Sequence, residues 1–280
     1  MAPIIALLTD FGTEDSYVGV MKGVILGICP EARLIDITHR IQPQNVQQAA
    51  FVLLNAYRYF PVDTVFLTIV DPGVGSKRRP IGVRAGSYTF IAPDNGLLSY
   101  TLAELPPATV VELSNAAMRE SAVSATFHGR DVFAPAAAHL ACGTSLLDFG
   151  QVIGDMVMLP KPRLEITSER VVGEIMHIDR FGNIITSIGP FNWVTSEQIT
   201  MYARPGVPQP VQVAAPTASV LIRGAELKGI RRTYSEGSVG ELMSIIASDR
   251  YLEVAVNQGN AAERLGAKIG DIVELIPEQK

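Results

Sequence analysis

Residues 64–70, followed by Asp71-Pro72-Gly73-Val74-Gly75, constrain the fold more than any other stretch of the sequence. The run carries no charge and is rich in β-branched residues, which predicts a strand buried on both faces. Such strands belong to parallel sheets covered by helices, and those sheets bind ligands at the carboxyl ends of their strands. Asp71 therefore either faces a ligand or hydrogen-bonds its own backbone in a tight turn.

Strand and helix patterns alternate through the first half of the chain. This alternation predicts an α/β N-terminal domain, a mostly parallel sheet with flanking helices. The strand patterns cover 4–8, 32–37, 64–70, 81–84, 88–92 and 109–113, and the helical patterns cover 17–28, 46–59, 97–102 and 132–142.

The second half of the chain has a different pattern. The Pro-rich stretch 159–163 is the best linker candidate. Short strand patterns separated by turn signals follow it, with one helical pattern at 261–265. We predict two domains: the α/β domain at residues 1–160 and a smaller all-β, barrel-like or sandwich-like domain at 168–280. The strand patterns of the second domain are 170–179, 183–187, 199–203, 211–213, 220–222, 242–247, 251–256 and 272–276.

The composition excludes several classes of protein. Hydrophobic residues make up 48% and charged residues 18%, and the net charge is −5, which argues against disorder and against nucleic-acid binding. The apolar N-terminal run is too short for a signal peptide or a membrane span, so we expect a cytoplasmic protein without membrane association. Cys29 and Cys142 lack metal-ligand spacing, and we expect them to be free, buried thiols.

Two more loops in the first half carry candidate functional side chains. Asp10 follows the first strand pattern, where a carboxylate can accept hydrogen bonds from a ribose diol or cap the next helix. No Gly-rich phosphate-binding sequence follows it, so nucleotide phosphates are not indicated. His128 lies in a Gly turn before a helical pattern, where it is either an acid–base group near neutral pH or a structural residue.

Two segments of the second half have the same ambiguity. Asp179-Arg180-Phe181-Gly182-Asn183 reads as a hairpin turn or as a loop that stacks an adenine on its aromatic ring. Residues 251–262 form a strand pattern that opens into a Gly/Asn loop, which either binds a ligand with its backbone or simply connects strand to helix.

Taken together in chain order, these segments resemble the S-adenosyl-L-methionine hydroxide adenosyltransferase family, the hydrolase relatives of fluorinase and chlorinase. The resemblance covers nearly the whole chain. Its motifs are Thr9-Asp10-Phe11-Gly12, Asp71-Pro72-Gly73-Val74-Gly75, Arg78, Ala92-Pro93-Asp94-Asn95-Gly96, Phe127-His128-Gly129-Arg130-Asp131, Asp179-Arg180-Phe181-Gly182-Asn183 and the 252–262 tail.

The resemblance implies that water or hydroxide attacks C5′ of S-adenosyl-L-methionine and releases adenosine and L-methionine, without a metal or a cofactor. It also implies a homotrimer whose sites lie between the N-terminal domain of one subunit and the C-terminal domain of the next. Asp71, Arg78 and His128 match the family's catalytic set. The substrate-binding positions that it implies are Asp10, Phe127, Asp179, Phe181, Asn183, Ser248 and Glu253.

Two alternatives belong to other functional classes. A halide-dependent adenosyl transferase would resemble the halogenases, which replace the Asp and His and carry an insertion in the N-terminal domain. Here Asp71 and His128 are present, and the halide-contacting serine position falls on Gly129. A protein that binds adenosine or S-adenosyl-L-methionine without turnover would need Asp10 but could dispense with Asp71 and His128.

Overall fold

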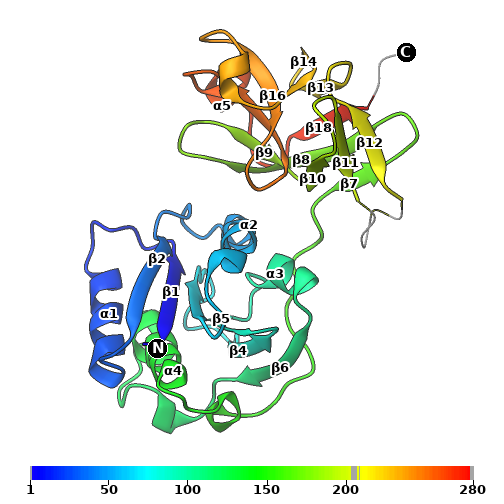
Figure 1. Ribbon diagram of the computed structural model, residues 1–280. Coiled ribbons are helices and arrows are strands. Elements are labelled where there is room, and N and C mark those ends of the chain that lie inside the picture. The colour runs from blue at the N-terminus through cyan, green and yellow to red at the C-terminus, as the bar shows by residue number, and fades with distance from the viewer. Residues whose placement is uncertain (1, 203–206, 208, 278–280) are drawn as a thin grey trace. The chain divides into compact units, whose positions relative to one another are not determined.

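A computed structural model describes residues 2–202, 207 and 209–277 of the chain. It divides into two compact units, Met1–Pro160 and Lys161–Lys280, which we describe one by one (Figure 1). The predicted domains at 1–160 and 168–280 include Met1 and residues 278–280, which lie outside the described residues.

The N-terminal unit is built on a six-stranded sheet with the strand order β2-β1-β3-β5-β4-β6. Strands β2, β1, β3 and β5 run parallel, and β4 runs antiparallel to both of its neighbours. The reversal at β4 follows from its two-residue connection to β5, Gly86-Ser87, because a parallel crossover needs a dozen or more residues. The strands are β1 (Ile4–Thr9), β2 (Arg33–Thr38), β3 (Val65–Ile69), β4 (Pro80–Ala85), β5 (Tyr88–Pro93) and β6 (Pro107–Glu112).

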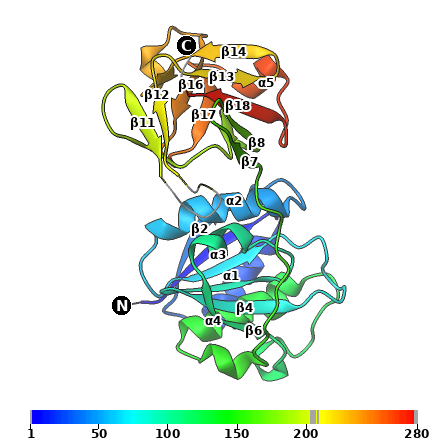
Figure 2. The ribbon, with the colours of Figure 1, turned by 90° about the vertical axis from the view of Figure 1, so that its right-hand side faces the viewer.

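Helices cover both faces of this sheet, as Figure 1 shows for α1 and α2 on opposite sides of β1. Ile5 and Leu7 of β1 pack with Met21 of α1 and Phe133, just before α4, in one core cluster. The residues between them point to the opposite face, because side chains alternate along a strand. There α2 packs against α3 (Figure 2). The helices are α1 (Tyr17–Ile28), α2 (Val46–Ala56), α3 (Ser99–Glu104) and α4 (Ala134–Ala141), with short turns η1 (Tyr57–Tyr59), η2 (Ala116–Met118), η3 (Gly129–Phe133) and η4 (Leu146–Phe149).

Every predicted element of this unit is present, although the helix predicted at 97–102 lies two residues later, at Ser99–Glu104, and the helix predicted at 46–59 ends at Ala56. The helix predicted at 17–28 has these bounds in the structure. The helix predicted at 132–142 begins earlier, because the π-helical turn η3 runs directly into α4 and His128 stands at its N-cap position. Asp131 holds this turn in place by accepting the backbone N–H of Ser124 at 2.7 Å.

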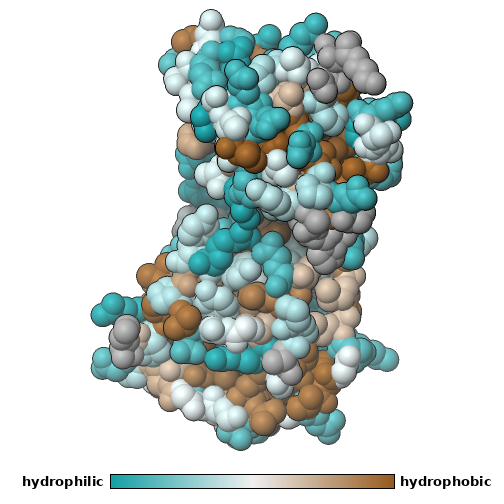
Figure 3. Space-filling model, turned by 45° about the vertical axis from the view of Figure 1, so that its right-hand side comes forward, coloured by the Kyte–Doolittle hydropathy of each residue, from teal (hydrophilic) through white to brown (hydrophobic). Residues whose placement is uncertain are grey.

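The C-terminal unit consists mainly of strands, in a nine-stranded sheet and a three-stranded sheet. Strands β14 and β15 stand at opposite ends of the order β14-β13-β18-β8-β9-β17-β16-β15, yet only Gly229 separates them in sequence. The large sheet therefore curls into a nearly closed, barrel-like form, which agrees with the predicted β-rich domain. In the view of Figure 3, both units carry hydrophobic patches among hydrophilic residues.

Most strands of this unit match a predicted pattern, whereas β7, β10, β14 and β15 do not. These four have two to four residues each, so their pairing depends on neighbouring strands more than on a pattern of their own. Ala203, at the end of the strand predicted at 199–203, lies outside the described residues. The elements are β7 (Leu164–Ile166), β8 (Val171–Ile178), β9 (Ile184–Thr186), β10 (Phe191–Trp193), β11 (Gln198–Met201), β12 (Val211–Ala214), β13 (Ser219–Ile222), β14 (Ala225–Lys228), β15 (Ile230–Arg231), η5 (Tyr234–Glu236), β16 (Leu242–Ile246), β17 (Leu252–Val256), α5 (Ala261–Leu265) and β18 (Ile272–Ile276).

Among all these described helices, none has the length and apolar character that a bilayer crossing requires.

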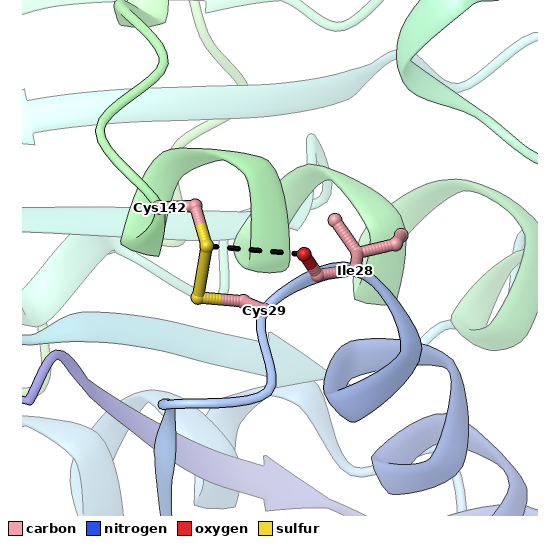
Figure 4. The surroundings of a disulfide bond; sticks show 3 residues. All are labelled: Ile28, Cys29 and Cys142. Atoms are coloured by element: carbon pink, nitrogen blue, oxygen red, sulfur yellow. Dashed lines mark hydrogen bonds between the residues drawn. A yellow bond between two sulfur atoms is a disulfide. The ribbon is translucent and has the colours of Figure 1, made fainter.

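The two cysteines form a disulfide, so the expectation of free thiols was wrong (Figure 4). Cys29 follows α1 and Cys142 follows α4, and these two helices pack against each other. Their packing brings the two Cα atoms to 5.8 Å, within the usual range for a disulfide. Sequence spacing could not indicate the bond, because 113 positions separate the cysteines and only the tertiary fold joins them.

We predict that the disulfide stabilises the N-terminal unit. In the chain-entropy account, closing a loop of this length contributes about 2–5 kcal/mol to the free energy of unfolding. Reductant should therefore lower the denaturant midpoint of the wild-type protein to about that of Cys142→Ser, whose own midpoint should not change with reductant. Cys142 is exposed, so serine there buries no new polar group. Two titratable thiols in the unreduced wild type, unfolded in denaturant so that Cys29 is accessible, would contradict the prediction.

Candidate active site

The loop after β3 folds Arg78 back onto Asp71. Backbone hydrogen bonds from Val74 to Asp71 (3.2 Å) and from Ser76 to Gly73 (3.0 Å) form its turns. Gly75 has φ 75°, and a Cβ there would lie 2.5 Å from the carbonyl oxygen of Ala125, so the position requires glycine.

Arg78 and Asp71 form a forked ion pair. Nε of Arg78 donates to both carboxylate oxygens of Asp71 at 3.0 Å, and Nη2 donates to Oδ2 at 2.5 Å. The two side chains are only 9% and 6% exposed, so water screens the pair weakly. The guanidinium also lies 5.1 Å from the ring centre of Phe133. Arg78 is thus fixed from several sides.

His128 extends this pair into a chain of three side chains. Nη2 of Arg78 lies 2.8 Å from Nδ1 of His128. A guanidinium can only donate, so we assign Nδ1 as the acceptor and place the ring proton on Nε2. Burial and the positive charge of Arg78 lower the pKa of His128 below its ordinary 6.5, against the opposing charge of Asp71. The ring is therefore neutral near neutral pH.

The three groups offer complementary chemistry. Asp71 supplies carboxylate oxygens, and an ionised carboxylate accepts at more sites than the contacts from Arg78 occupy. The lone pair of His128 is engaged by Arg78, so its remaining polar atom is the donor Nε2–H. An acceptor and a donor, both held by one cation, can orient a water molecule and take up its proton.

Asp10 lies at the same edge of the sheet. Thr9 pairs with Ile69 across β1 and β3, so Asp10 and Asp71 leave the carboxyl ends of neighbouring parallel strands. Oδ2 of Asp10 accepts the backbone N–H of Gln44 at 2.8 Å. The N-cap residue of α1 is Ser16, which excludes the alternative that Asp10 caps this helix.

Phe127 belongs to an aromatic cluster beside this edge. Its ring centre lies 6.0 Å from that of Phe11 and 5.1 Å from that of Tyr17. Gly129 is enclosed by the same groups, because a Cβ there would lie 3.0 Å from Cε2 of Phe127 and 3.2 Å from Sδ of Met21. Any side chain at Gly129 would have to displace one of these neighbours.

In the C-terminal unit, one turn between β8 and β9 carries Asp179, Phe181 and Asn183. Oδ1 of Asp179 accepts the backbone N–H groups of Phe181 (2.8 Å) and Asn183 (2.9 Å), and Oδ2 accepts Nδ2 of Asn183 at 3.0 Å. Asp179 therefore shapes the turn, as the hairpin interpretation expected. The ring of Phe181 is nevertheless 74% exposed, which is unusual for a large apolar side chain and suits a contact surface.

Glu253 and Ser248 lie on and just before β17. Glu253 is 4% exposed, and Oε1 accepts the hydroxyl of Tyr234 at 2.7 Å. Burial raises the pKa of Glu253 to about 7; the Tyr234 hydrogen bond opposes this, and the charges of Asp179 and Asp249 add to it. Ser248 is exposed in the turn between β16 and β17.

The structure therefore joins Asp71, Arg78 and His128 directly and places Asp10 and Phe127 at the same edge. Asp179, Phe181, Asn183, Ser248 and Glu253 lie on the other unit. Sequence reasoning missed Tyr234, which reaches Glu253 from η5, and Arg119, whose positive charge also lowers the pKa of His128. No motif marked either residue, because Tyr234 acts through a contact between η5 and β17 and Arg119 acts through its charge alone.

We predict that Arg78 controls the protonation of His128. Arg78→Met removes a neighbouring positive charge and leaves Asp71, so the pKa of His128 should rise above its wild-type value. The NMR titration of the His128 ring protons measures this, with His128→Asn to assign the signal. A wild-type pKa above 6.5, or no rise in Arg78→Met, would contradict the assignment of a neutral ring.

Comparisons with known proteins identify the family to which the chain belongs. The sequence matches the profile of the SAM hydroxide adenosyltransferase N-terminal domain over residues 5–150 and that of the C-terminal domain over residues 173–274. The chain therefore belongs to the SAM hydroxide adenosyltransferase family, as the motifs predicted.

Relatives with curated names cover almost the whole chain. The (R)-S-adenosyl-L-methionine hydrolase of Thermus thermophilus is 37% identical over 96% of this chain and 98% of its own length. The fluorinase of an Actinoplanes species is 30% identical over 96% of this chain and 95% of its own length. A crystal structure of an uncharacterized conserved protein from Thermotoga maritima is 35% identical, with a TM-score of 0.85, and covers 97% of this chain and 99% of its own.

Proposed function

We propose that this protein is an enzyme that hydrolyses S-adenosyl-L-methionine to adenosine and L-methionine. The observation that carries the proposal is the hydrogen-bonded chain of Asp71, Arg78 and His128, at the carboxyl edge of the sheet beside Asp10. Four relatives named (R)-S-adenosyl-L-methionine hydrolase, 33–37% identical over at least 96% of this chain, support it.

The reaction makes a modest demand on the protein. A water oxygen attacks C5′ while the C5′–S bond breaks, and its electron pair leaves with sulfur as the neutral thioether of methionine. The leaving group therefore needs no acid. What the protein supplies is alignment of the water with the C5′–S bond, worth about 7–11 kcal/mol in well-oriented systems, and removal of one water proton.

Each of the three side chains has a distinct role in this proposal. Asp71 accepts the proton of the water, because its carboxylate retains acceptor sites. His128 donates its Nε2–H to the water oxygen, since Arg78 occupies the Nδ1 lone pair. Arg78 holds both groups and stabilises the negative charge that develops on the attacking oxygen.

The remaining site residues bind the substrate. Asp10 accepts the ribose hydroxyls and Phe127 lines the site next to His128. The nucleoside and methionine portions of the substrate are contacted by Asp179, Phe181, Asn183 and Ser248. Glu253 is buried, so it contributes to the site through its hydrogen bond with Tyr234. The family resemblance further implies a homotrimer, in which the site residues of one subunit's N-terminal domain meet those of the next subunit's C-terminal domain. Sedimentation velocity measures this oligomeric state directly.

The halide-dependent alternative is disfavoured by Gly129. A serine there would need space that Phe127, Met21 and Phe11 occupy, with the nearest atom 3.0 Å from the new Cβ. The non-catalytic alternative leaves the chain of Asp71, Arg78 and His128 without a use.

We predict that the purified protein converts S-adenosyl-L-methionine into adenosine and L-methionine, separated by chromatography, and that added chloride or fluoride leaves the products unchanged. A 5′-halo-adenosine product would support the halogenase instead. Unchanged substrate, in protein that binds adenosine, would support the binding protein.

Substitutions in the catalytic set should slow adenosine release. Asp71→Ala, Arg78→Ala and His128→Ala each remove a positioned group, and we expect at least about a tenfold loss of rate. Arg84→Gln is a matched control, because it breaks the exposed Arg84–Asp63 pair, whose Asp63 precedes β3 at the opposite edge of the sheet. Wild-type turnover by a folded Asp71→Ala variant would remove Asp71 from the mechanism.

A further inference from the structure

A buried histidine lies behind Asp10 and has no role in the function proposed above. His39 directly follows β2 and is 5% exposed. Its Nδ1 lies 2.8 Å from Oγ1 of Thr9, a residue that is fully buried and immediately precedes Asp10. Thr9 Oγ1 also accepts the backbone N–H of Phe11 at 3.2 Å. A hydroxyl that accepts one N–H can still donate its own proton, so we assign Thr9 Oγ1 as the donor to Nδ1 of His39 and place the ring proton on Nε2, on the side of Asp36.

Further contacts tie the backbone around His39 to the loop that carries Asp10. The carbonyl oxygen of His39 accepts the N–H of Gly12 at 2.8 Å. The N–H of Gln44 binds Oδ2 of Asp10, and Gln44 has φ 66°, a strained conformation for a residue other than glycine. The neighbours of Asp10 on both sides, Thr9 and Phe11, are thus anchored, while Gln44 holds the carboxylate itself.

His39 is in turn held from its other side. Nε2 lies 3.0 Å from Oδ1 of Asp36, at ion-pair distance although off the N–H direction. Oδ2 of Asp36 accepts Nζ of Lys22 at 2.7 Å. Partial burial raises the pKa of Asp36, but the neighbouring Lys22 and His39 outweigh it and lower the pKa overall. Asp36 therefore stays ionised and orients the ring.

We propose that His39 is a positioning residue for nucleoside binding, which acts through Thr9 to place the carboxylate of Asp10 against the 2′- and 3′-hydroxyls of the ribose. This inference rests on the proposed role of Asp10. His39 touches no substrate, and its effect is limited to the part of the affinity that depends on the diol.

The test compares the dissociation constants of adenosine and 2′,3′-dideoxyadenosine, measured by calorimetry on the full-length protein. We use the dissociation constant of 2′,3′-dideoxyadenosine divided by that of adenosine. This ratio reports the contribution of the diol alone and does not depend on turnover. Asp10→Ala removes the hydrogen bonds between the diol and a charged carboxylate. Because such bonds contribute strongly to the binding free energy, we expect this variant to reduce the ratio by about tenfold or more. His39→Leu should reduce it by at least about threefold, within that limit.

A conservative variant and a double variant separate positioning from a general loss of structure. The side-chain oxygen of His39→Asn lies near the position of Nδ1 and can accept the Thr9 hydroxyl, so this variant should keep most of the preference for adenosine. In the Asp10→Ala background, His39→Leu should change the ratio no further, because the group through which it acts is gone. Asp36→Asn, at a partly exposed position, should give a smaller loss in the same direction.

Several outcomes would overturn the inference. These are a wild-type ratio in folded His39→Leu, an equal loss in His39→Asn and His39→Leu, and additive effects of His39→Leu and Asp10→Ala. If His39→Leu does not fold, an unchanged ratio in Asp36→Asn overturns it too. A wild-type protein that hydrolyses the substrate but binds both nucleosides equally would remove the role of Asp10, and the inference with it, while leaving the proposed hydrolysis intact.

Discussion

The ion pair between Asp71 and Arg78 is the interaction on which the candidate site depends. Both side chains are almost completely withdrawn from water, so each charge needs the other, and removal of one partner of such a pair is strongly destabilising. The pair leaves the Nη2 group of Arg78 shared between Asp71 and His128. Burying two charges costs desolvation free energy, and two apolar side chains of similar size often give equal or greater stability. The presence of the ion pair is therefore consistent with a functional role.

The position of this pair follows from the sheet. Parallel strands β1 and β3 end side by side, which places Asp10 next to the Asp71 loop. Asn95 reinforces this edge, because its Nδ2 donates to the carbonyl oxygen of Val70 at 2.8 Å. Asp94, one residue earlier, binds Arg79 at 2.6 Å, so the neighbouring arginines 78 and 79 pair with different carboxylates. The motif around Asp94 therefore contributes to the packing of the loops at this edge.

Two glycines of the site mark where its segments pack most closely. Gly75 lets the Asp71 loop approach the segment before His128, and Gly129 lets three side chains close around the start of η3. A Cβ at Gly75 would lie 2.5 Å from the carbonyl oxygen of Ala125, and a Cβ at Gly129 would press on Phe127, Met21 and Phe11. These glycines contribute close packing and no chemistry of their own.

The sequence by itself determined the alternation of strands and helices in the first unit, the β-rich second unit, the family and the identity of the charged candidates. Those features depend on local patterns and on motifs that can be read in order. Only the tertiary structure decided that Arg78 binds both Asp71 and His128, that Glu253 is buried against Tyr234, and that Cys29 and Cys142 are bonded. These contacts join segments 7 to 113 positions apart, and no local pattern encodes which distant surfaces will pack together.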